Sequence, residues 1–499
     1  MPHLLGIDVG TTNTKAVLCD VEGRLVGQAA APTPSTPGVP GQATSDPESV
    51  FATVLQVLRD TVAQCPTAEV VGIGVSSMAE AGVPLDSHDA PVYPIIAWYD
   101  NRTLPYRAWW AERLDDDALY AVTGLQPGHI YSLNKILWLR DHEPAAYARL
   151  ARWLSVSDYV AYRLSGEQAM SYSQASRTLA FDVRSLRWSV PLLHLAAVAQ
   201  GIFPTAVPSG QTLGPLRPEV ARACGLKPGA IVAAGGHDHL CAALACGATK
   251  PGVVLDSIGT TEAVLSALAE PRTGPDVRRL GLHCGVHVVP RAYYIIGGLL
   301  GIGPMQRWLV DAFLGMEPGD EAYVRLAELA ATSPAGAQGL LFLPFLAGGG
   351  APQIDPSASG GWLGLRLHHT RADLVRAALE GAAMELHRLL DCFAAVADAE
   401  GLVAALRAVG GGSRSSLGLQ LRADVTGRMV ETPAESERAA MGGALLGGLG
   451  AGVYTSAEEA AARAYRTDRT YQPHPERRQL YAERYRQYLN ALLARHLTP

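Results

Sequence analysis

The sequence predicts an α/β protein built from two similar domains, and three observations lead to this prediction. The chain has 499 residues, more than a single hydrophobic core usually serves, so two domains are expected. Short strand-like apolar runs alternate with helix-like segments, which is the pattern of α/β architectures. Finally, GIDVGTTNTKAVL at 6–18 recurs loosely as LDSIGTTEAVL at 255–265. Two domains that each contain one Gly-Thr-Thr turn could therefore face each other across a cleft.

The individual elements follow from their apolar patterns. Strands are expected where short apolar runs are bounded by turn residues, at 4–10, 16–21, 70–77, 230–236, 252–259, 263–268 and 292–298. Helices are expected where apolar residues recur every three or four positions, at 48–65, 371–397 and 476–496. The proline-rich stretch 31–42 is expected to be a loop. The runs on either side of each Gly-Thr-Thr triplet are short enough to form the two arms of a β-hairpin.

Composition and charge limit the classes of function. Hydrophobic residues make up 48% of the chain and the net charge is −6, so neither a nucleic acid nor an anionic membrane surface is expected as a partner. The seven cysteines are scattered and form no Cys-x-x-Cys pair, which is typical of reduced thiols. No charged segment followed by an apolar run opens the chain, and its apolar stretches are short and glycine-rich. These features predict a cytoplasmic protein.

The first Gly-Thr-Thr turn has the chemistry of an anion site. A tight turn of glycine and small hydroxyl residues directs backbone N–H groups outward, and the threonine hydroxyls add donors. Asp8 lies on the strand before the turn, where an unpaired carboxylate is costly to bury. Beside a triphosphate, Asp8 could hold Mg²⁺ through water, and Lys15 could supply a compensating charge. The alternative is an ordinary hairpin with a solvated aspartate.

The second candidate is Asp238, which follows the predicted strand 230–236 and precedes a helix-like run. A carboxylate there could act as general base, accepting a proton from a hydroxyl that attacks phosphorus. Two other interpretations remain open. His237 and His239 could form a metal site with a His-x-His spacing, although no third ligand lies nearby at the usual spacing. Asp238 could also simply cap the helix that follows it.

Six motifs in order resemble the FGGY family of carbohydrate kinases. They are GIDVGTTNTKAVL, GGHDH, DSIGTTEAVL, PFLAGGGAPQIDPSASGGWLGL with RAALEGAAMELHRLLD, GGGSRSSLGLQLRADVTGRMV, and AAMGGALLGG. The resemblance runs from Gly6 to about Tyr454 and implies two ribonuclease-H-like domains of the actin-like ATPase fold, with mixed sheets flanked by helices and the active site in the cleft between them. It implies domains at 1–247 and 248–499, ATP and Mg²⁺ as cofactors, and transfer of a phosphoryl group to a terminal hydroxyl of a sugar or polyol. A homodimer is compatible with it.

The resemblance also implies roles for individual residues. Asp238 matches the family's catalytic aspartate, and Asp8 is expected near the magnesium ion. The phosphates are expected to meet both turns, and the adenosine is expected to lie against small residues of the second domain, because glycine permits close backbone approach. The nucleotide-binding set is Gly10, Thr11, Thr12, Asn13, Lys15, Gly259, Thr260, Thr261, Gly303, Gly411, Gly412 and Ser415.

The expected sugar site lies in two segments, 74–86 and 95–103. A polyhydroxylated substrate needs hydrogen-bond partners and an aromatic wall against its C–H face. The residues that match are Met78, Ala79, Glu80, Trp98, Asp100, Arg102 and His239. Two structural alternatives stay open: Trp98 could be a core residue, and Asp100 and Arg102 could form a loop ion pair.

Two departures from the family pattern leave the substrate open. Glu80 stands where xylulokinases have a histidine and glycerol kinases a glutamate, but Ala79 stands where glycerol kinases have an arginine. Gly349 and Gly350 stand where many members have charged residues. A ketopentose such as xylulose is the leading substrate, and a glycerol- or erythritol-type polyol is the alternative. An alternative of another class is a non-enzymatic nucleotide switch or a sugar-binding regulator on the same fold.

Overall fold

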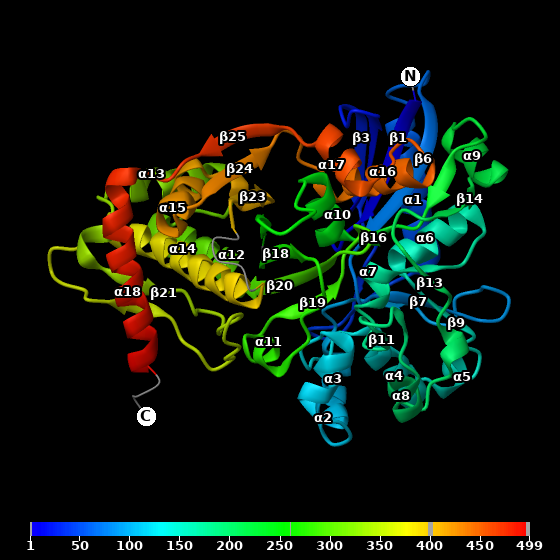
Figure 1. Cartoon of the computed structure of the whole chain (residues 1–499), viewed down its shortest axis with the longest axis horizontal. Helices are drawn as coiled ribbons and strands as arrows, with labels where there is room; N and C mark the ends of the chain where they lie inside the picture. The colour runs from blue at the N-terminus through cyan, green and yellow to red at the C-terminus, as the bar shows by residue number, and fades with distance from the viewer. Residues whose placement is uncertain (1, 260, 398–402, 496–499) are drawn as a thin grey trace.

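The chain folds into two lobes that lie side by side in the computed structural model (Figure 1), which describes residues 2–259, 261–397 and 403–495. One lobe contains the N-terminus and most of the first half of the chain. The other lobe contains most of the second half and the C-terminal helix α18 (Arg478–Arg495). Each lobe is built around a seven-stranded sheet.

The first sheet mixes parallel and antiparallel strands. Its order is β14-β15-β6-β1-β2-β3, and β16 pairs with β6 as an extra strand. The three strands at one edge are antiparallel, whereas β6 runs parallel to both β1 and β15, and β14 closes the other edge antiparallel. The bounds are β1 (Pro2–Val9), β2 (Asn13–Asp20), β3 (Leu25–Pro32), β6 (Glu69–Ser77), β14 (Thr212–Pro215), β15 (Ile231–Ala233) and β16 (Gly236–His237).

The second sheet repeats this pattern of directions. Its order is β19-β20-β18-β17-β23-β24-β25, with antiparallel β20, β18 and β17, parallel β17, β23 and β24, and an antiparallel edge strand. The bounds are β17 (Val253–Ile258), β18 (Glu262–Leu268), β19 (His283–Val286), β20 (Tyr293–Leu299), β23 (Ala405–Val409), β24 (Met429–Pro433) and β25 (Thr467–Tyr471). The two mixed sheets confirm the predicted α/β class, and their shared strand pattern accounts for the internal repeat.

Both predicted hairpins form. β1 pairs antiparallel with β2, with Asp8 opposite Lys15, and β17 pairs antiparallel with β18. The other predicted strands are present, with one difference: 230–236 divides into β15 and β16. The break falls where Gly235 passes so close to β6 that a Cβ there would lie 1.7 Å from the carbonyl oxygen of Val75. The stretch 31–42 is mostly loop, as expected, with the two-residue strand β4 (Thr36–Pro37) inside it.

Helices cover the sheets as predicted. α1 (Pro47–Val62), α6 (Val156–Ser165) and α9 (Pro218–Cys224) pack in the first lobe, where the side chains of α1 join the core of the first sheet. In the second lobe α14 (Arg371–Val396) packs against α15 (Ser416–Thr426) and α13 (Asp320–Ala331). Tyr481, Tyr485 and Tyr488 of α18 are buried in the same lobe, so the C-terminal helix packs against the body as its sequence predicts.

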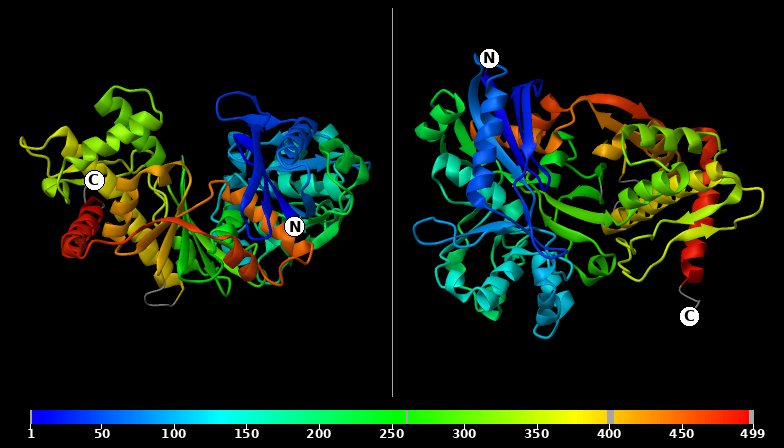
Figure 2. Two further views of the ribbon diagram at one scale, coloured as in Figure 1. Left: turned by 90° about the horizontal axis from the view of Figure 1, so that it is seen from above. Right: turned by 180° about the vertical axis from the view of Figure 1, so that it is seen from behind.

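One C-terminal helix belongs in space to the first sheet. α16 (Arg438–Gly450) packs on β1, β6 and α10 (Asp238–Ala245), and Figure 2 shows it beside the N-terminal strands. Glycines permit this approach, because a Cβ on Gly74 would lie 2.1 Å from the carbonyl oxygen of Gly443. The chain therefore returns to its first lobe after completing most of the second.

α10 and α16 lie in a core shared by both sheets. This core includes Leu4 and Val17 from the first sheet and Leu255 and Leu265 from the second, all essentially inaccessible to solvent. A separate set of short helices extends the first lobe and has its own aromatic core: α2 (Pro105–Ala111), α3 (Asp116–Thr123), α4 (Ser132–His142), α5 (Pro144–Tyr147), α7 (Tyr172–Ala175) and α8 (Val190–Leu195).

The cysteines and the apolar stretches behave as their sequence context suggests. All seven cysteines are free thiols. None of the helices in the described part of the chain combines the length and the apolar character that a bilayer crossing requires.

Candidate active site

Three neighbouring parallel strands of the first sheet end at the same edge. Asp8 on β1 lies opposite Ser76 on β6, and Ser76 lies opposite Gly236 on β16. The residues that follow these strands therefore meet: the first Gly-Thr-Thr turn, the segment 78–80 and Asp238. In open α/β sheets, ligands bind outside the carboxyl ends of parallel strands. This edge brings together three predicted groups: the catalytic candidate Asp238, the first phosphate turn and the sugar segment 78–80.

The first turn is tight and its threonines are exposed. The amide of Gly10 donates to the carbonyl of Asn13 at 3.0 Å, which closes the turn. Thr33, which follows β3, holds the turn in place through its hydroxyl, which donates to the carbonyl of Gly10 at 2.8 Å. The indole Nε1 of Trp98 donates to Oγ1 of Thr11 at 2.9 Å. The turn is thus anchored from two sides, while Thr11 and Thr12 remain exposed to solvent.

Asp8 and Asp238 are two carboxylates close enough for the charge of one to affect the pKa of the other. Oδ1 of Asp8 accepts a hydrogen bond from Oγ of Ser76 at 2.7 Å. Burial, and then the negative charge of Asp238, raise the pKa of Asp8 to about 7. Lys15 reduces this effect only in part, because its Nζ pairs with Oε2 of Glu437 at 2.7 Å. A divalent cation would relieve the repulsion between the two carboxylates, so the donor set fits a magnesium ion.

Asp238 begins helix α10 and its side chain is 27% exposed. Its Oδ1 accepts a hydrogen bond from the amide of His239 at 2.6 Å and lies 3.2 Å from Nε2 of His237. Burial raises the pKa of Asp238 above its usual value, because the charged carboxylate is poorly solvated there. His237, not Asp238, occupies the N-cap position of α10. The ligand-capable atoms of His237, Asp238 and His239 lie within 4.8 Å of one another, so the His-x-His interpretation retains a geometric basis.

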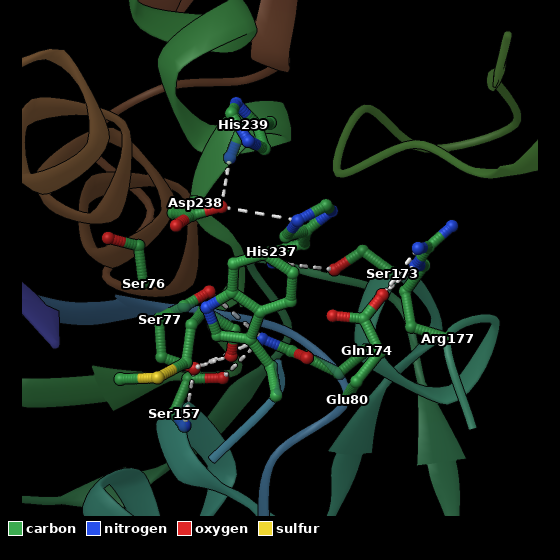
Figure 3. Close-up of polar contacts among 12 residues, drawn as sticks. Ser76, Ser77, Glu80, Ser157, Ser173, Gln174, Arg177, His237, Asp238 and His239 are labelled. Carbon is green, nitrogen blue, oxygen red and sulfur yellow. Dashed lines mark hydrogen bonds and ion pairs between the residues drawn. The ribbon is translucent and has the colours of Figure 1, made fainter. Parts of the chain in front are cut away.

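Glu80 is held against Arg177, a residue that no sequence motif indicated. Nε of Arg177 donates to Oε1 of Glu80 at 2.6 Å, and Nη2 contacts the same oxygen. Both side chains are buried, and Figure 3 shows them in the same region as His237 and Asp238. Gln174 donates hydrogen bonds to the hydroxyls of Ser77 and Ser157 and links α7 to the end of β6. Arg177 lies 97 positions after Glu80, and no spacing in the sequence connects them.

The other predicted sugar-site residues differ in burial and in whether their polar groups already have hydrogen-bond partners. Asp100 is fully buried, and its carboxylate accepts from Nε and Nη2 of Arg102 at 2.9 Å each and from the amide of Ala43 at 2.8 Å. The loop ion pair considered from the sequence therefore exists. Trp98 and Met78 are half-buried and Ala79 is buried, next to the first turn and Glu80. His239 is half-buried and its ring meets that of His237 edge to face.

The nucleotide-binding candidates of the second lobe gather at the ends of two parallel strands. The second turn follows β17, and the glycines of the 3₁₀ helix η5 (Gly411–Arg414) follow β23, which pairs with β17. Gly412 lies against Ile258 so closely that a Cβ would come within 2.2 Å of it. Gly259 and Thr261 are exposed, and Thr260 lies outside the described residues. Among the described residues, no hydrogen bond or ion pair joins this group to the first turn.

Two further candidates lie on helices of this lobe. Gly303 is the second residue of α12 (Ile302–Leu309), which follows β20. Ser415 caps α15, where its Oγ accepts from the amide of Gly418 at 3.2 Å. Its hydroxyl therefore already has one structural role.

A buried charge cluster connects the second turn to α15. Arg422 on α15 donates from Nε to Asp256 at 2.9 Å and from Nη2 to Glu262 at 2.6 Å. All three side chains are at most 5% exposed. Burial raises the pKa of Glu262 to about 8. The positive charge of Arg422 opposes this rise, and the negative charge of Asp256 adds to it. Because Glu262 directly follows Thr261, this cluster fixes the turn relative to the helix that begins beside the glycines of η5.

The chain matches two family models in sequence. Residues 3–245 match the N-terminal domain of the FGGY family of carbohydrate kinases, and residues 255–451 match its C-terminal domain. A xylulose kinase of Bacillus subtilis (strain 168) is 28% identical over 492 residues, which cover 98% of this chain and 96% of the relative. A gluconokinase of the same organism is 29% identical over 454 residues, with 89% and 87% covered.

The fold also matches a solved structure of the same family. The crystal structure of a xylulose kinase from Rhodospirillum rubrum aligns with a TM-score of 0.90 at 30% identity and covers 99% of both chains. The resemblance inferred from the six motifs is thereby confirmed, together with the actin-like ATPase fold and the enzymatic class. This chain belongs to the FGGY family of carbohydrate kinases and is an ATP-dependent sugar kinase.

Proposed function

We propose that this kinase transfers the γ-phosphoryl group of ATP to a terminal hydroxyl of a ketopentose such as xylulose, with Asp238 as the general base. The observation that carries the proposal is the position of Asp238. It is partly exposed, follows β16 directly and lies at the edge where the first turn and the segment 78–80 also end. The xylulose kinases from B. subtilis and R. rubrum match over nearly their whole length and support the ketopentose.

Asp238 takes the proton of the attacking hydroxyl as the oxygen bonds to phosphorus and ADP leaves. A magnesium ion would be held by Asp8 through water and would neutralise negative charge on the phosphates. Asn13, Lys15 and the two Gly-Thr-Thr turns bind the phosphate chain. Closure of the two lobes excludes water and so limits hydrolysis of ATP.

The adenosine would lie on the second lobe. Gly411 and Gly412 allow the flat base to approach the backbone after β23. Gly303 on α12 and Ser415 at the start of α15 border this region. Ser415 contributes through the helix start that it caps, because its hydroxyl is bonded to the amide of Gly418.

The sugar would lie between Asp238 and Glu80. Met78, Ala79 and Trp98 provide apolar contact, and Glu80 and His239 provide polar contact. Asp100 and Arg102 act indirectly in this proposal, because each already satisfies the other through two hydrogen bonds. They hold the loop that carries Trp98.

A polyol of the glycerol or erythritol type is the second candidate. A specific observation favours it: a carboxylate, Glu80, occupies the segment after β6, and Arg177 fixes its position. A carboxylate accepts hydrogen bonds from neighbouring hydroxyls and needs no keto group beside them, so a polyol would satisfy Glu80 as well as a ketose would.

Two structural proposals accompany the function. We propose that the catalytic domains divide at residues 247 and 248, with α16 of the second segment completing the first lobe by packing on β1 and β6. We also propose a homodimer, which light scattering of the purified protein would test against a monomer.

A substrate panel tests the proposed reaction. ADP release would be measured with ketopentoses, aldoses, polyols and sugar acids, and the phosphorylated position would be read by phosphorus NMR. We expect ADP release to depend on an added ketopentose and its rate to fall by a factor on the order of 10²–10⁴ in Asp238→Asn. Sugar-independent ATP hydrolysis that Asp238→Asn leaves unchanged would contradict the proposal.

A further inference from the structure

Glu80 is presented in a strained backbone conformation. Its φ is 64°, in the left-handed region that a glutamate seldom adopts. The amide of Ala81 donates to the carbonyl of Ala79 at 2.7 Å, so Glu80 is the central residue of a γ-turn. The hydroxyl of Ser132 on α4 binds the carbonyl oxygen of Glu80 at 2.9 Å and holds the turn. Strain of this kind persists where surrounding structure enforces it, and it marks sites where a side chain must point in one direction.

Arg177 neutralises Glu80 but does not satisfy it. Both contacts from Arg177 end on the same oxygen, Oε1 of Glu80. Oε2 accepts no hydrogen bond from any described residue. On the other side, Nη1 of Arg177 is buried and has no hydrogen-bond partner among the described residues. Oε2 of Glu80 is therefore the free acceptor of the pair, although the net charge of the pair is zero.

A third unsatisfied group lies on the second lobe. Tyr294 on β20 is fully buried, and within the described part of the chain its hydroxyl has no hydrogen-bond partner of good geometry. The charges of Arg177 and Glu80 both act on this hydroxyl. Tyr294 and Arg177 lie close enough to interact directly, so these two buried groups are neighbours of each other, and Oε2 of Glu80 remains as the atom open to a ligand.

Lys135 on α4 is the other cation that needs consideration. It is fully buried, and its Nζ donates to the carbonyl of Ile130. Burial lowers the pKa of Lys135 to about 8, and Glu80 and Asp100 oppose this effect. Its hydrogen bond to the backbone commits it, so Arg177 is the cation that pairs with Glu80.

We propose that the Glu80–Arg177 pair selects neutral polyhydroxylated substrates and excludes sugar acids. This inference rests on the proposed function, in which the sugar lies between Asp238 and Glu80. A substrate hydroxyl can donate a hydrogen bond to Oε2 of Glu80, while Arg177 holds the other oxygen of the carboxylate. A carboxylate has no proton to donate, and it would lie beside the Glu80 carboxylate in a buried site. Two like charges there repel strongly, because little solvent screens them.

The proposal predicts a reversal of specificity by a single substitution. Glu80→Gln keeps the shape of the side chain and leaves the charge of Arg177 uncompensated. We expect D-gluconate to bind Glu80→Gln about 10-fold or more tightly than it binds the wild type, as for a charge-assisted hydrogen bond. The kcat/KM for a neutral ketopentose or polyol should fall by about 10- to 100-fold in the same variant.

Two further variants separate charge from general damage. Arg177→Gln should weaken the binding of the neutral substrate. It should not increase the affinity for D-gluconate, because Glu80 keeps its negative charge. Glu80→Gln/Arg177→Gln removes both charges, and its affinity for D-gluconate should return to that of the wild type. Circular dichroism and ADP binding would establish that each variant is folded. If a variant is too unstable for calorimetry at room temperature, the shift of its melting temperature on adding D-gluconate would measure binding instead.

Calorimetry without ATP decides the inference independently of catalysis. Tighter D-gluconate binding by Glu80→Gln alone would support it. Equal binding by all four proteins, or wild-type preference for D-gluconate over neutral sugars, would overturn it. Failure of the proposed reaction would appear differently, as an absence of sugar-dependent ADP release by the wild type with every member of the panel.

Discussion

Trp98 and Thr11 are joined by a hydrogen bond of 2.9 Å from the indole Nε1 to the threonine Oγ1. The two residues are 87 positions apart and belong to the two segments that the sequence assigned to sugar and phosphate. The bond fixes the position of the aromatic ring relative to the turn. A substrate stacked on Trp98 would therefore have a defined distance to a phosphate bound at the turn.

Trp98→Phe tests this link. Phenylalanine keeps an aromatic face but cannot donate to Thr11. A hydrogen bond contributes about 0.5–1.5 kcal/mol, so we expect KM for both ATP and sugar to rise by up to about 10-fold with the free energy of unfolding little changed. Steady-state kinetics with each substrate varied would measure this. An increase in KM for the sugar alone would contradict a role at the turn.

Asp238→Asn tests the general base. The amide cannot accept the proton of the substrate hydroxyl, so kcat should fall by a factor on the order of 10²–10⁴. ADP affinity should remain nearly that of the wild type, as measured by calorimetry. A near-normal kcat with the true substrate would show that another group takes the proton.

The raised pKa of Asp8 would make the proposed binding of Mg²⁺ depend on pH. Without a metal the pKa of Asp8 is about 7, so the carboxyl takes up a proton as the pH falls from about 8 to about 6. We expect the concentration of Mg²⁺ needed for half-maximal activity to rise over this range. In Asp8→Asn the pH dependence should flatten while overall activity drops.

The same shift affects stability in the absence of metal. The folded pKa lies above the value of 3.8 expected for the unfolded chain, so Asp8 favours the folded state below about pH 4. That contribution is lost as the pH rises through about 7. Urea unfolding at about pH 5.5 and about pH 8 should therefore show a larger loss of stability toward the higher pH in the wild type than in Asp8→Asn. Equal losses in the two proteins would contradict the raised pKa.

Arg422→Met tests the buried cluster below the second turn. The substitution leaves Asp256 and Glu262 without a cation and should lower the free energy of unfolding by roughly 3–5 kcal/mol. The loss should be smaller at low pH, where the carboxyls are protonated and need no partner. Denaturant unfolding at several pH values would measure it.

The matched control is an exposed pair. Arg414 and Asp320 are 2.9 Å apart, but their side chains are 68% and 77% exposed. Arg414→Met should cost less than about 1 kcal/mol, because solvent screens the pair. Equal losses in the two variants would show that the buried cluster contributes no more than a surface ion pair.

Gly74→Ala tests the seat of α16 on the first sheet. Its Cβ would lie 2.1 Å from the carbonyl oxygen of Gly443, so the helix must move. We expect a loss of about 1–3 kcal/mol in thermal or denaturant unfolding. Gly201→Ala is the control: its new methyl group would meet no atom within 4 Å, so stability should change by less than about 0.5 kcal/mol. A tolerated Gly74→Ala would mean that α16 does not rest closely on β6.

The local pattern of the sequence determined the strands, the main helices and both Gly-Thr-Thr hairpins. Each depends on neighbouring residues alone: alternating apolar runs form strands, and glycine with small hydroxyl residues forms the turns. The same local signals made Asp8 and Asp238 candidates, because a carboxylate at the end of a buried strand is costly unless it has a partner. The family motifs supplied the nucleotide and sugar segments in order.

The tertiary structure alone decided which distant residues meet. Arg177 pairs with Glu80, and Lys15 forms an ion pair with Glu437, which lies 422 positions later in the chain. Helix α16 packs on the first sheet. The ion pair of Asp100 with Arg102 was one of two interpretations until packing fixed it. The physical reason is that burial and charge pairing depend on the folded neighbourhood, whereas a sequence pattern records only what lies within a few residues along the chain.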